Sequence, residues 1–243
     1  MQITGIIAKH LNWHLTADHL HIDFGSELPV LSSAVLNGGY TQAQHFLNMR
    51  VTHNPDIDYS APSQTLKDYC DQLAIKGTCC GMMTAAYMDS FRIQQVSVAD
   101  EEIAVFVTTG IGNARRVGDP ADEITKKHYP RKIGTINLLL ATTAALTPAA
   151  QAEALMMVTE AKAAALQNLQ ILSPVSGLTA TGTGTDSVAI VSNIANNNDL
   201  FAVPYVGKHL PFGEALGKTV ISAIESSLEN ETAEEETVTV LCD

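Results

Sequence analysis

The chain has 243 residues, of which 46% are hydrophobic and 16% charged, so it is long enough to bury a substantial core and too apolar for a disordered protein. No apolar run approaches the roughly 20 residues that a membrane-spanning helix needs, and the N-terminus carries His10, Asn12 and His14 where a signal peptide needs a continuous apolar stretch. We therefore expect a soluble, cytoplasmic protein with one domain over residues 1–243 and an acidic C-terminal tail at residues 229–243.

The formal net charge is −12, and seven of the 26 acidic residues lie between Glu225 and the C-terminus. Such a balance repels phosphate backbones, which argues against a nucleic-acid partner. The four cysteines contain no CxxC motif, so we expect reduced, mostly buried thiols. Four histidines lie near the N-terminus, at positions 10, 14, 19 and 21, but no acidic ligand set follows at a recognisable spacing, so we predict no metal site.

Apolar runs bounded by turn residues predict mainly strands in the first 110 residues. A turn from Thr16 to His19 joins two of them, at residues 11–15 and 20–24, in a hairpin. The further predicted strands are residues 29–36, 44–51, 80–85, 91–98 and 103–108. One helix lies among them, and we expect Ser63 to cap it and Leu73 to end it.

The second half of the chain contains the clearest helix. Thr147 is a suitable N-cap, Pro148 suits the first helical position, and an Ala-rich sequence continues to about Leu169. Strands are predicted at residues 133–141 and 187–192, and a last helix at residues 213–228. This order of elements predicts an α/β (mixed α+β) fold, a layered sandwich of mixed sheets with helices on the outer faces.

Four polar loops suggest a ligand site, because each adjoins an apolar segment where backbone amides and short side chains can converge. They cover residues 31–39, 109–120, 179–187 and 204–213. Neither Gly110-x-Gly112 nor Gly182-x-Gly184 completes a dinucleotide fingerprint, and no phosphate-binding P-loop occurs. The alternative is that these glycines only form tight turns. The hydroxyls around Asp186 in the third loop favour binding.

Lys162 occupies an unusual position in the Ala-rich helix. On a helical wheel it lies within the apolar stripe, whereas Glu160 lies on the opposite side. The stripe consists of Leu155, Val158, Ala165, Leu166 and Leu169. Lys162 therefore either extends to the edge of the core, or enters a site where it pairs with a carboxylate such as Asp186 or polarises a substrate group.

In six motifs the chain closely resembles the adenosylcobinamide amidohydrolase family, the CbiZ proteins. The motifs are LSSAVLNGG (31–39), TGIGNARRVGDP (109–120), TIN (135–137), TEAKAAALQNL (159–169), TGTGTDS (181–187) and GKH (207–209). The resemblance extends from about Leu31 to Val220. The first 25 residues and the acidic tail lie outside it.

The resemblance implies hydrolysis of the amide that joins aminopropanol to the corrin ring, which converts adenosylcobinamide to adenosylcobyric acid in cobinamide salvage and cobalamin biosynthesis. The corrinoid is then a small-molecule substrate, and we expect no cofactor. The chain agrees, because it lacks the Asp-x-His-x-x-Gly pattern of proteins that bind cobalt through a histidine. We expect no nucleic-acid or membrane partner, and a homo-oligomer is compatible with the sequence.

Amide hydrolysis needs a nucleophile, donors for the oxyanion and a proton for the leaving amine. We predict Asp186 as the general base for water or for the Thr185 hydroxyl, and Lys162 or His209 as the proton donor. The predicted substrate-binding residues are Ser33, Asn37, Gly38, Gly39, Asn113, Arg115, Arg116, Glu160, Thr183 and Gly184. Among these, Asn37, the Gly38–Gly39 amides and the 182–185 amides are the candidate oxyanion donors. Lys208 departs from the family pattern, which has a small hydroxyl residue before the histidine.

Two further functions stay open at this point. One is a corrinoid-binding protein with the same fold and no catalytic activity. The other is an amidase that acts on an unrelated small amide, which would keep the Thr- and Asp-containing loop as its site.

Overall fold

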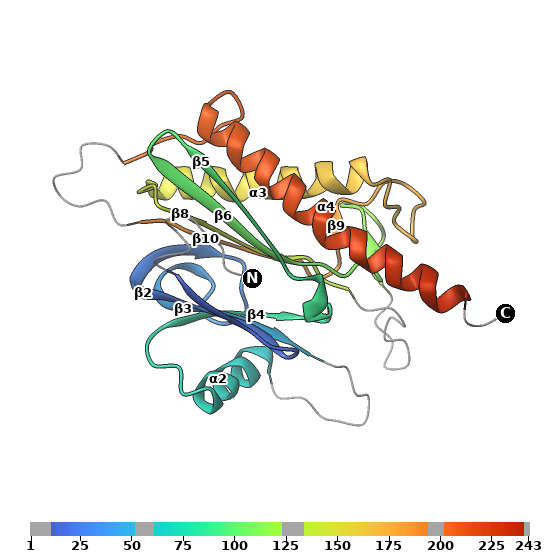
Figure 1. Ribbon diagram of the computed structural model, residues 1–243, viewed down its shortest axis with the longest axis horizontal. Coiled ribbons are helices and arrows are strands. Elements are labelled where there is room, and N and C mark those ends of the chain that lie inside the picture. Colours follow the sequence, from blue (N-terminus) through green and yellow to red (C-terminus); the bar gives the residue numbers. More distant parts are fainter. Residues whose placement is uncertain (1–10, 52–60, 123–133, 194–201, 241–243) are drawn as a thin grey trace.

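The computed structural model describes residues 11–51, 61–122, 134–193 and 202–240, and side chains up to residue 229. Its main feature is an eight-stranded mixed sheet with the order β4-β3-β2-β10-β8-β6-β5, in which β1 also pairs with β2 (Figure 1). The strands are β1 (Asn12–Leu15), β2 (His19–Ser32), β3 (Gly39–Arg50), β4 (Cys79–Thr84), β5 (Arg92–Val98), β6 (Glu101–Thr108), β8 (Asn137–Thr142) and β10 (Ser187–Val191). A separate two-stranded sheet pairs β7 (Ala114–Arg115) with β9 (Gly182–Thr183).

The sheet curls so that its two halves enclose an inner core. Residues of β2, β3 and β4 share this core with residues of β6, β8 and β10. The strand β8 shows the alternation that this requires: Leu139 and Ala141 enter the inner core, whereas Leu138 and Leu140 enter a second core on the other face. A register shift between Asp23 and Leu28 marks a bulge in β2, which allows this long strand to pair in both halves.

Helices cover the two outer faces. The helices α3 (Pro148–Asn168) and α4 (Pro211–Val240) pack on β6, β8 and β10, and α2 (Pro62–Gln72) packs on the opposite side, against β3 and β4 (Figure 1). A short 3-10 helix, η1 (Met88–Ser90), precedes β5. The predicted mixed α/β sandwich with outer helices is confirmed. No helix in the described ranges combines the length and apolarity needed to cross a membrane.

Most predicted elements are present, with three differences. The predicted strand 20–24 and the first half of the predicted strand 29–36, up to Ser32, belong to one strand, β2, because the bulge bends the strand without ending it. Ser63 is not the cap of α2: Ala61 is, because Pro62 takes the first helical position, where its fixed φ and missing N–H suit a helix start. The last helix runs from Pro211 to Val240 and so extends into the acidic segment. The beginning of the strand predicted at residue 133 lies outside the described residues.

The N-cap of α3 gives a stability prediction. The Thr147 hydroxyl accepts a hydrogen bond from Ala150 N at 3.1 Å, so Thr147→Ala leaves an amide of the first turn without this partner. We expect the free energy of unfolding in urea to fall by about 1 kcal/mol. Thr159→Ala, on the exposed face of the same helix, is the control and should be neutral or slightly stabilising. Equal losses for both variants would contradict a capping role.

Candidate functional site

The strands β8 and β10 begin side by side and carry matching polar residues. They pair in parallel with Ser187 beside Asn137, and each is preceded by a threonine two residues earlier. The Oγ1 atoms of Thr135 and Thr185 lie 2.6 Å apart. Because side chains alternate along a strand, Thr135, Asn137, Thr185 and Ser187 share the inner face, while Ile136 and Asp186 lie on the helix side. We call the four inner-face residues the polar ladder.

On the helix side, Asp186 forms a buried ion pair with Lys162 of α3, and each side chain is 8% exposed. The carboxylate also accepts hydrogen bonds from Ile136 N and Thr183 N, both at 2.9 Å, and from the Thr183 hydroxyl. The predicted pairing of Lys162 with Asp186 is therefore present, and the lysine does not extend to the edge of the core. A Cβ at Gly182 would lie 2.3 Å from Asp186 Oδ2, so this contact requires glycine.

Asp186 and Thr185 do not contact each other through their side chains. The Thr185 hydroxyl contacts the Thr135 hydroxyl and the Gly134 carbonyl oxygen, at 2.6 and 3.2 Å. Within the described chain no hydrogen bond links it to the Asp186 carboxylate, which lies on the other face of the strand. The role of Asp186 as a general base stays a prediction. The geometry shows a carboxylate that fixes the TGTGTDS turn to β8 and α3.

The predicted site residues Glu160 and His209 lie near another side of α3. Glu160 forms an ion pair with Lys208, and both side chains are largely exposed. His209 follows Lys208 and is also exposed. Since residues two apart on a helix point about 200° from each other, Glu160 faces away from Lys162. The structure therefore does not bring His209 and Glu160 to the Lys162–Asp186 pair, and Lys208 has an ionic partner of its own.

The LNGG loop is shaped largely by its own backbone. Asn37 has a left-handed φ of 53° and donates from Nδ2 to the Cys79 carbonyl oxygen at 2.7 Å. A Cβ at Gly38 would lie 2.1 Å from the Ala34 carbonyl oxygen, and Gly39 has a φ of 84°. Earlier in the same motif, the Ser33 hydroxyl lies 3.1 Å from that of Ser187. Of these predicted residues, Ser33 reaches the polar ladder through its side chain.

The two arginines connect loops. Backbone pairing of β7 with β9 brings the TGIGNARRVGDP loop to the TGTGTDS loop, so two of the four predicted loops meet. Arg115 forms an ion pair with Asp122. Arg116 donates from its guanidinium to the Thr179 carbonyl oxygen at 2.9 Å and from its backbone N to Asp119 at 2.8 Å. Both guanidinium groups therefore bind the protein itself in this structure.

Sequence reasoning missed a buried polar chain that joins the two halves of the sheet. Asn137 donates from Nδ2 to Asn48 Oδ1 at 2.8 Å, and Asn48 donates from Nδ2 to the Thr108 hydroxyl at 2.9 Å. Asn137 Oδ1 is buried and has no hydrogen-bond partner in the described chain. The available signal was the presence of single polar residues in otherwise apolar strands.

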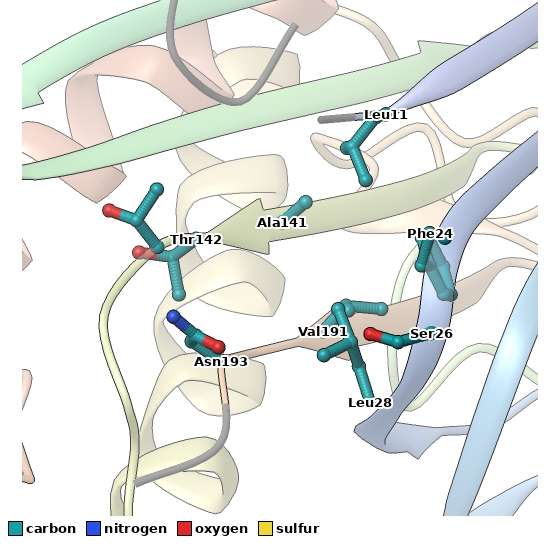
Figure 2. A pocket seen from close by; sticks show the side chains of 10 residues that line it. Leu11, Phe24, Ser26, Leu28, Ala141, Thr142, Val191 and Asn193 are labelled. Atoms are coloured by element: carbon teal, nitrogen blue, oxygen red, sulfur yellow. The ribbon is translucent and has the colours of Figure 1, made fainter. Parts of the chain in front are cut away.

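A pocket of about 420 Å³ lies at the other end of β8 and β10. Figure 2 shows its apolar side chains, among them Leu11, Phe24 and Val191, with Ser26 and Thr142 nearby. The strand β8 has six residues, so the pocket is roughly 16 Å from the polar ladder. None of the predicted site residues lines it. The predicted chemistry and this pocket are therefore at opposite ends of the sheet.

The histidines and cysteines lie elsewhere. His19 Nδ1 is 3.0 Å from the Tyr69 hydroxyl, and His21 Nε2 is 3.3 Å from His45 Nδ1. No group of three or more potential metal ligands occurs in the part of the chain described. Cys70, Cys79 and Cys80 are free and buried, as expected. Cys242 and His10 lie outside the described residues.

Comparison with known families agrees with the six motifs. The model of the adenosylcobinamide amidohydrolase (CbiZ) family matches residues 6–236. The chain belongs to this family. It is therefore an amide-hydrolysing enzyme. The match is longer than the region from Leu31 to Val220 that carries the six motifs, and it includes β1 and residues 229–236 of the acidic tail.

Three curated relatives match most of the chain. An adenosylcobinamide amidohydrolase of Methanosarcina mazei is 26% identical over 204 residues, covering 81% of this chain and 88% of the relative. One of Halobacterium salinarum is 32% identical over 206 residues, covering 81% and 79%. An uncharacterised protein of Methanocaldococcus jannaschii is 32% identical over 228 residues, covering 86% and 85%.

Solved structures show only a distant similarity. A β-aminopeptidase of Burkholderia sp. matches with a TM-score of 0.42 and 15% identity, covering 86% of this chain and 77% of its own. The PH0078 protein of Pyrococcus horikoshii matches with a TM-score of 0.40 and 12% identity, covering 89% and 78%. Similarity at this level does not bear on function.

The buried ion pair predicts a large loss of stability when one partner is removed. Lys162→Met leaves the Asp186 charge buried without its counter-ion, and we expect the free energy of unfolding to fall by about 3 kcal/mol. Lys208→Met breaks the exposed pair with Glu160 and should cost at most about 1 kcal/mol. Urea unfolding measures both.

A double-mutant cycle isolates the pairwise interaction. Lys162→Met combined with Asp186→Asn should lose less stability than the sum of the two single variants, by about 1 kcal/mol or more. Strict additivity would show that the two side chains do not interact in solution.

Proposed function

We propose that the protein hydrolyses the amide between aminopropanol and the corrin ring of adenosylcobinamide, in corrinoid salvage. Water adds across the C–N bond, and the products are adenosylcobyric acid, which carries the new carboxyl group, and free aminopropanol. The family match over residues 6–236 is the observation that carries this proposal. The two named relatives, at 26% and 32% identity, support it.

The polar ladder offers groups that suit a neutral amide substrate. It presents hydroxyl and carboxamide groups at the N-terminal ends of β8 and β10, and the charges of Lys162 and Asp186 are on the other face of the sheet. A corrin ring carries several amide side chains, which hydroxyl and carboxamide groups can recognise by hydrogen bonding. The corrinoid is substrate in this proposal, and no cofactor takes part.

The assignments of individual catalytic residues remain proposals. Lys162 and Asp186 belong to the site as the pair that fixes the TGTGTDS turn, whereas proton transfer by Asp186, Thr185 or His209 needs kinetic variants. We also propose a cytoplasmic location, which agrees with the free thiols of Cys70, Cys79 and Cys80. The proposal includes no nucleic-acid or membrane partner.

Incubation with adenosylcobinamide in the dark, without added metal, tests the proposed reaction. We expect the substrate to be converted to adenosylcobyric acid with equimolar release of aminopropanol, measured by chromatography and mass spectrometry. In ¹⁸O-water the new carboxyl group should carry one heavy oxygen, which distinguishes hydrolysis from transfer to another amine. Heat-denatured protein is the control.

Two outcomes would contradict the proposal. Unchanged adenosylcobinamide that co-elutes with the protein would indicate a corrinoid-binding protein without this activity. A protein that neither binds nor converts the corrinoid, judged by the visible absorbance of the eluted fraction, would leave an amidase for another small amide as the remaining function.

A further inference from the structure

Arg50, the last residue of β3, carries a positive charge that no acidic group of the described chain neutralises. Its side chain is half-buried, and its Nε atom is buried without a hydrogen-bond partner in the same residues. The guanidinium carbon lies 4.2 Å from the centre of the Tyr87 ring, in a cation–π contact. Buried polar groups of native proteins nearly always have hydrogen-bond partners, so a guanidinium group without one indicates a ligand site.

Strand alternation places Arg50 on the inner face, at the end of the sheet where β8 begins. Asn48, two residues earlier in β3, binds Asn137 of the polar ladder. Phe46, two residues earlier again, enters the inner core together with Leu139, the next inner-face residue of β8. Arg50 is the following inner-face residue of β3, about 7 Å beyond Asn48 along the strand and away from the core. It therefore lies on the same side of the Asn48–Asn137 contact as the start of β8.

Tyr87 reaches the same end of the sheet through a separate part of the chain. Ala86, the residue before it, packs against two glycine loops: a Cβ at Gly110 would lie 3.1 Å from the Ala86 Cβ and 3.4 Å from the Gly134 Cα. Gly134 directly precedes Thr135, whose carbonyl oxygen accepts a hydrogen bond from Gly110 N at 3.0 Å. Contacts from β3 and from the segment before η1 thus agree in placing the cation–π pair beside the start of the polar ladder.

The contact with Tyr87 positions the guanidinium group and leaves its hydrogen-bond donors unused. The ring lies against the guanidinium carbon, whereas the N–H donors are arranged around the edge of the planar group. Tyr87 is 67% exposed, so the pair borders solvent and a ligand can reach it. The neighbouring inner-face residues are neutral: Thr84 is the register partner of Arg50 on β4, and Thr108 binds Asn48. The guanidinium is thus an uncompensated cation in a neutral polar setting.

The proposed reaction produces the kind of group that such a cation binds. At neutral pH, hydrolysis converts the amide and water to a carboxylate and an ammonium ion, because the proton of the new carboxylic acid moves to the amine. Before the C–N bond breaks, the carbonyl oxygen already becomes negative as the nucleophile adds. The neutral groups of the polar ladder do not offset this charge. A guanidinium group does, through charge-assisted hydrogen bonds that can engage both oxygens of a carboxylate.

We propose that Arg50 is the anion-binding group of the active site. It binds the carbonyl oxygen of the scissile amide as negative charge develops there, and then the carboxylate of the product. This inference rests on the proposed amidohydrolase function and assigns a residue to the acyl side of the reaction. Arg50 is then a catalytic residue, and Tyr87 is a positioning residue that acts through it.

Variants of Arg50 test this assignment, because substrate and product differ in charge at the reacting carbon. Arg50→Met removes the cation and keeps an apolar stem, and we expect kcat on adenosylcobinamide to fall by about 10² or more. The Kd of adenosylcobyric acid, from equilibrium dialysis read by corrinoid absorbance, should rise about tenfold or more. The KM for the neutral substrate should stay within about threefold, because the cation acts mainly on the charged species. Arg50→Lys keeps the charge without the planar fork and should lose less than Arg50→Met.

A second pair of variants tests the positioning role of Tyr87. Tyr87→Ala should lower kcat and weaken adenosylcobyric acid binding by about threefold or more, and Tyr87→Phe, which keeps the ring, should recover most of this loss. Lys218→Met is the matched control, since it removes an exposed cation that pairs with Glu214 on α4, and it should change neither quantity. Thermal unfolding of each variant identifies any loss that comes from misfolding.

The outcomes separate this inference from the proposed function. An active wild type with Arg50→Met near wild-type kcat and product affinity would overturn the inference and leave the function intact. A KM that rises as much as the product Kd would indicate general loss of binding and also overturn it. If Arg50→Met does not fold, wild-type values in both Arg50→Lys and Tyr87→Ala would overturn it. A wild type without activity on adenosylcobinamide would overturn the function, and the inference with it.

Discussion

The structure around the site depends on one buried electrostatic interaction, the ion pair between Lys162 and Asp186. Burying two charges is costly, and the cost is offset only when the pair is close and its remaining hydrogen-bonding positions are filled. Here Ile136 N, Thr183 N and the Thr183 hydroxyl complete the carboxylate. The pair therefore fixes three separate pieces of chain, namely α3, the start of β8 and the TGTGTDS turn, in a single arrangement.

The ion pair between Lys162 and Asp186 determines which way the neighbouring residues point. Because Asp186 faces α3, strand alternation directs Thr185 and Ser187 to the inner face, and the parallel register places Thr135 and Asn137 beside them. The charges of Lys162 and Asp186 thus lie on the helix side of the sheet, and the neutral groups of the polar ladder lie on its inner face. The amide of the proposed substrate carries no net charge, and the neutral polar ladder suits it better than the charged helix side does.

The sequence predicts local features well and contacts between distant residues poorly. The strand pattern, the Thr147 cap and the position of Lys162 on the apolar stripe follow from periodicity and capping rules. The pairing of Asn48 with Asn137 joins residues 89 apart, and no local rule predicts it. The separation of His209 from Asp186 depends on how α3 packs. The packing of the Asn113 side chain against Gly134 and Gly184 likewise joins separate parts of the chain.

The long strand β2 links the site to the order in which the chain is made. Its C-terminal end pairs with β10, and Ser32 donates to the Val188 carbonyl oxygen, 156 residues away along the chain. Contacts of such high sequence separation form slowly and late. On the ribosome, the edge of β2 that β10 will cover stays open until Val191, the last residue of β10, has been added. Insertion of β10 then completes the main sheet and aligns Thr185 with Thr135, so the sheet and the polar ladder are completed by the same strand.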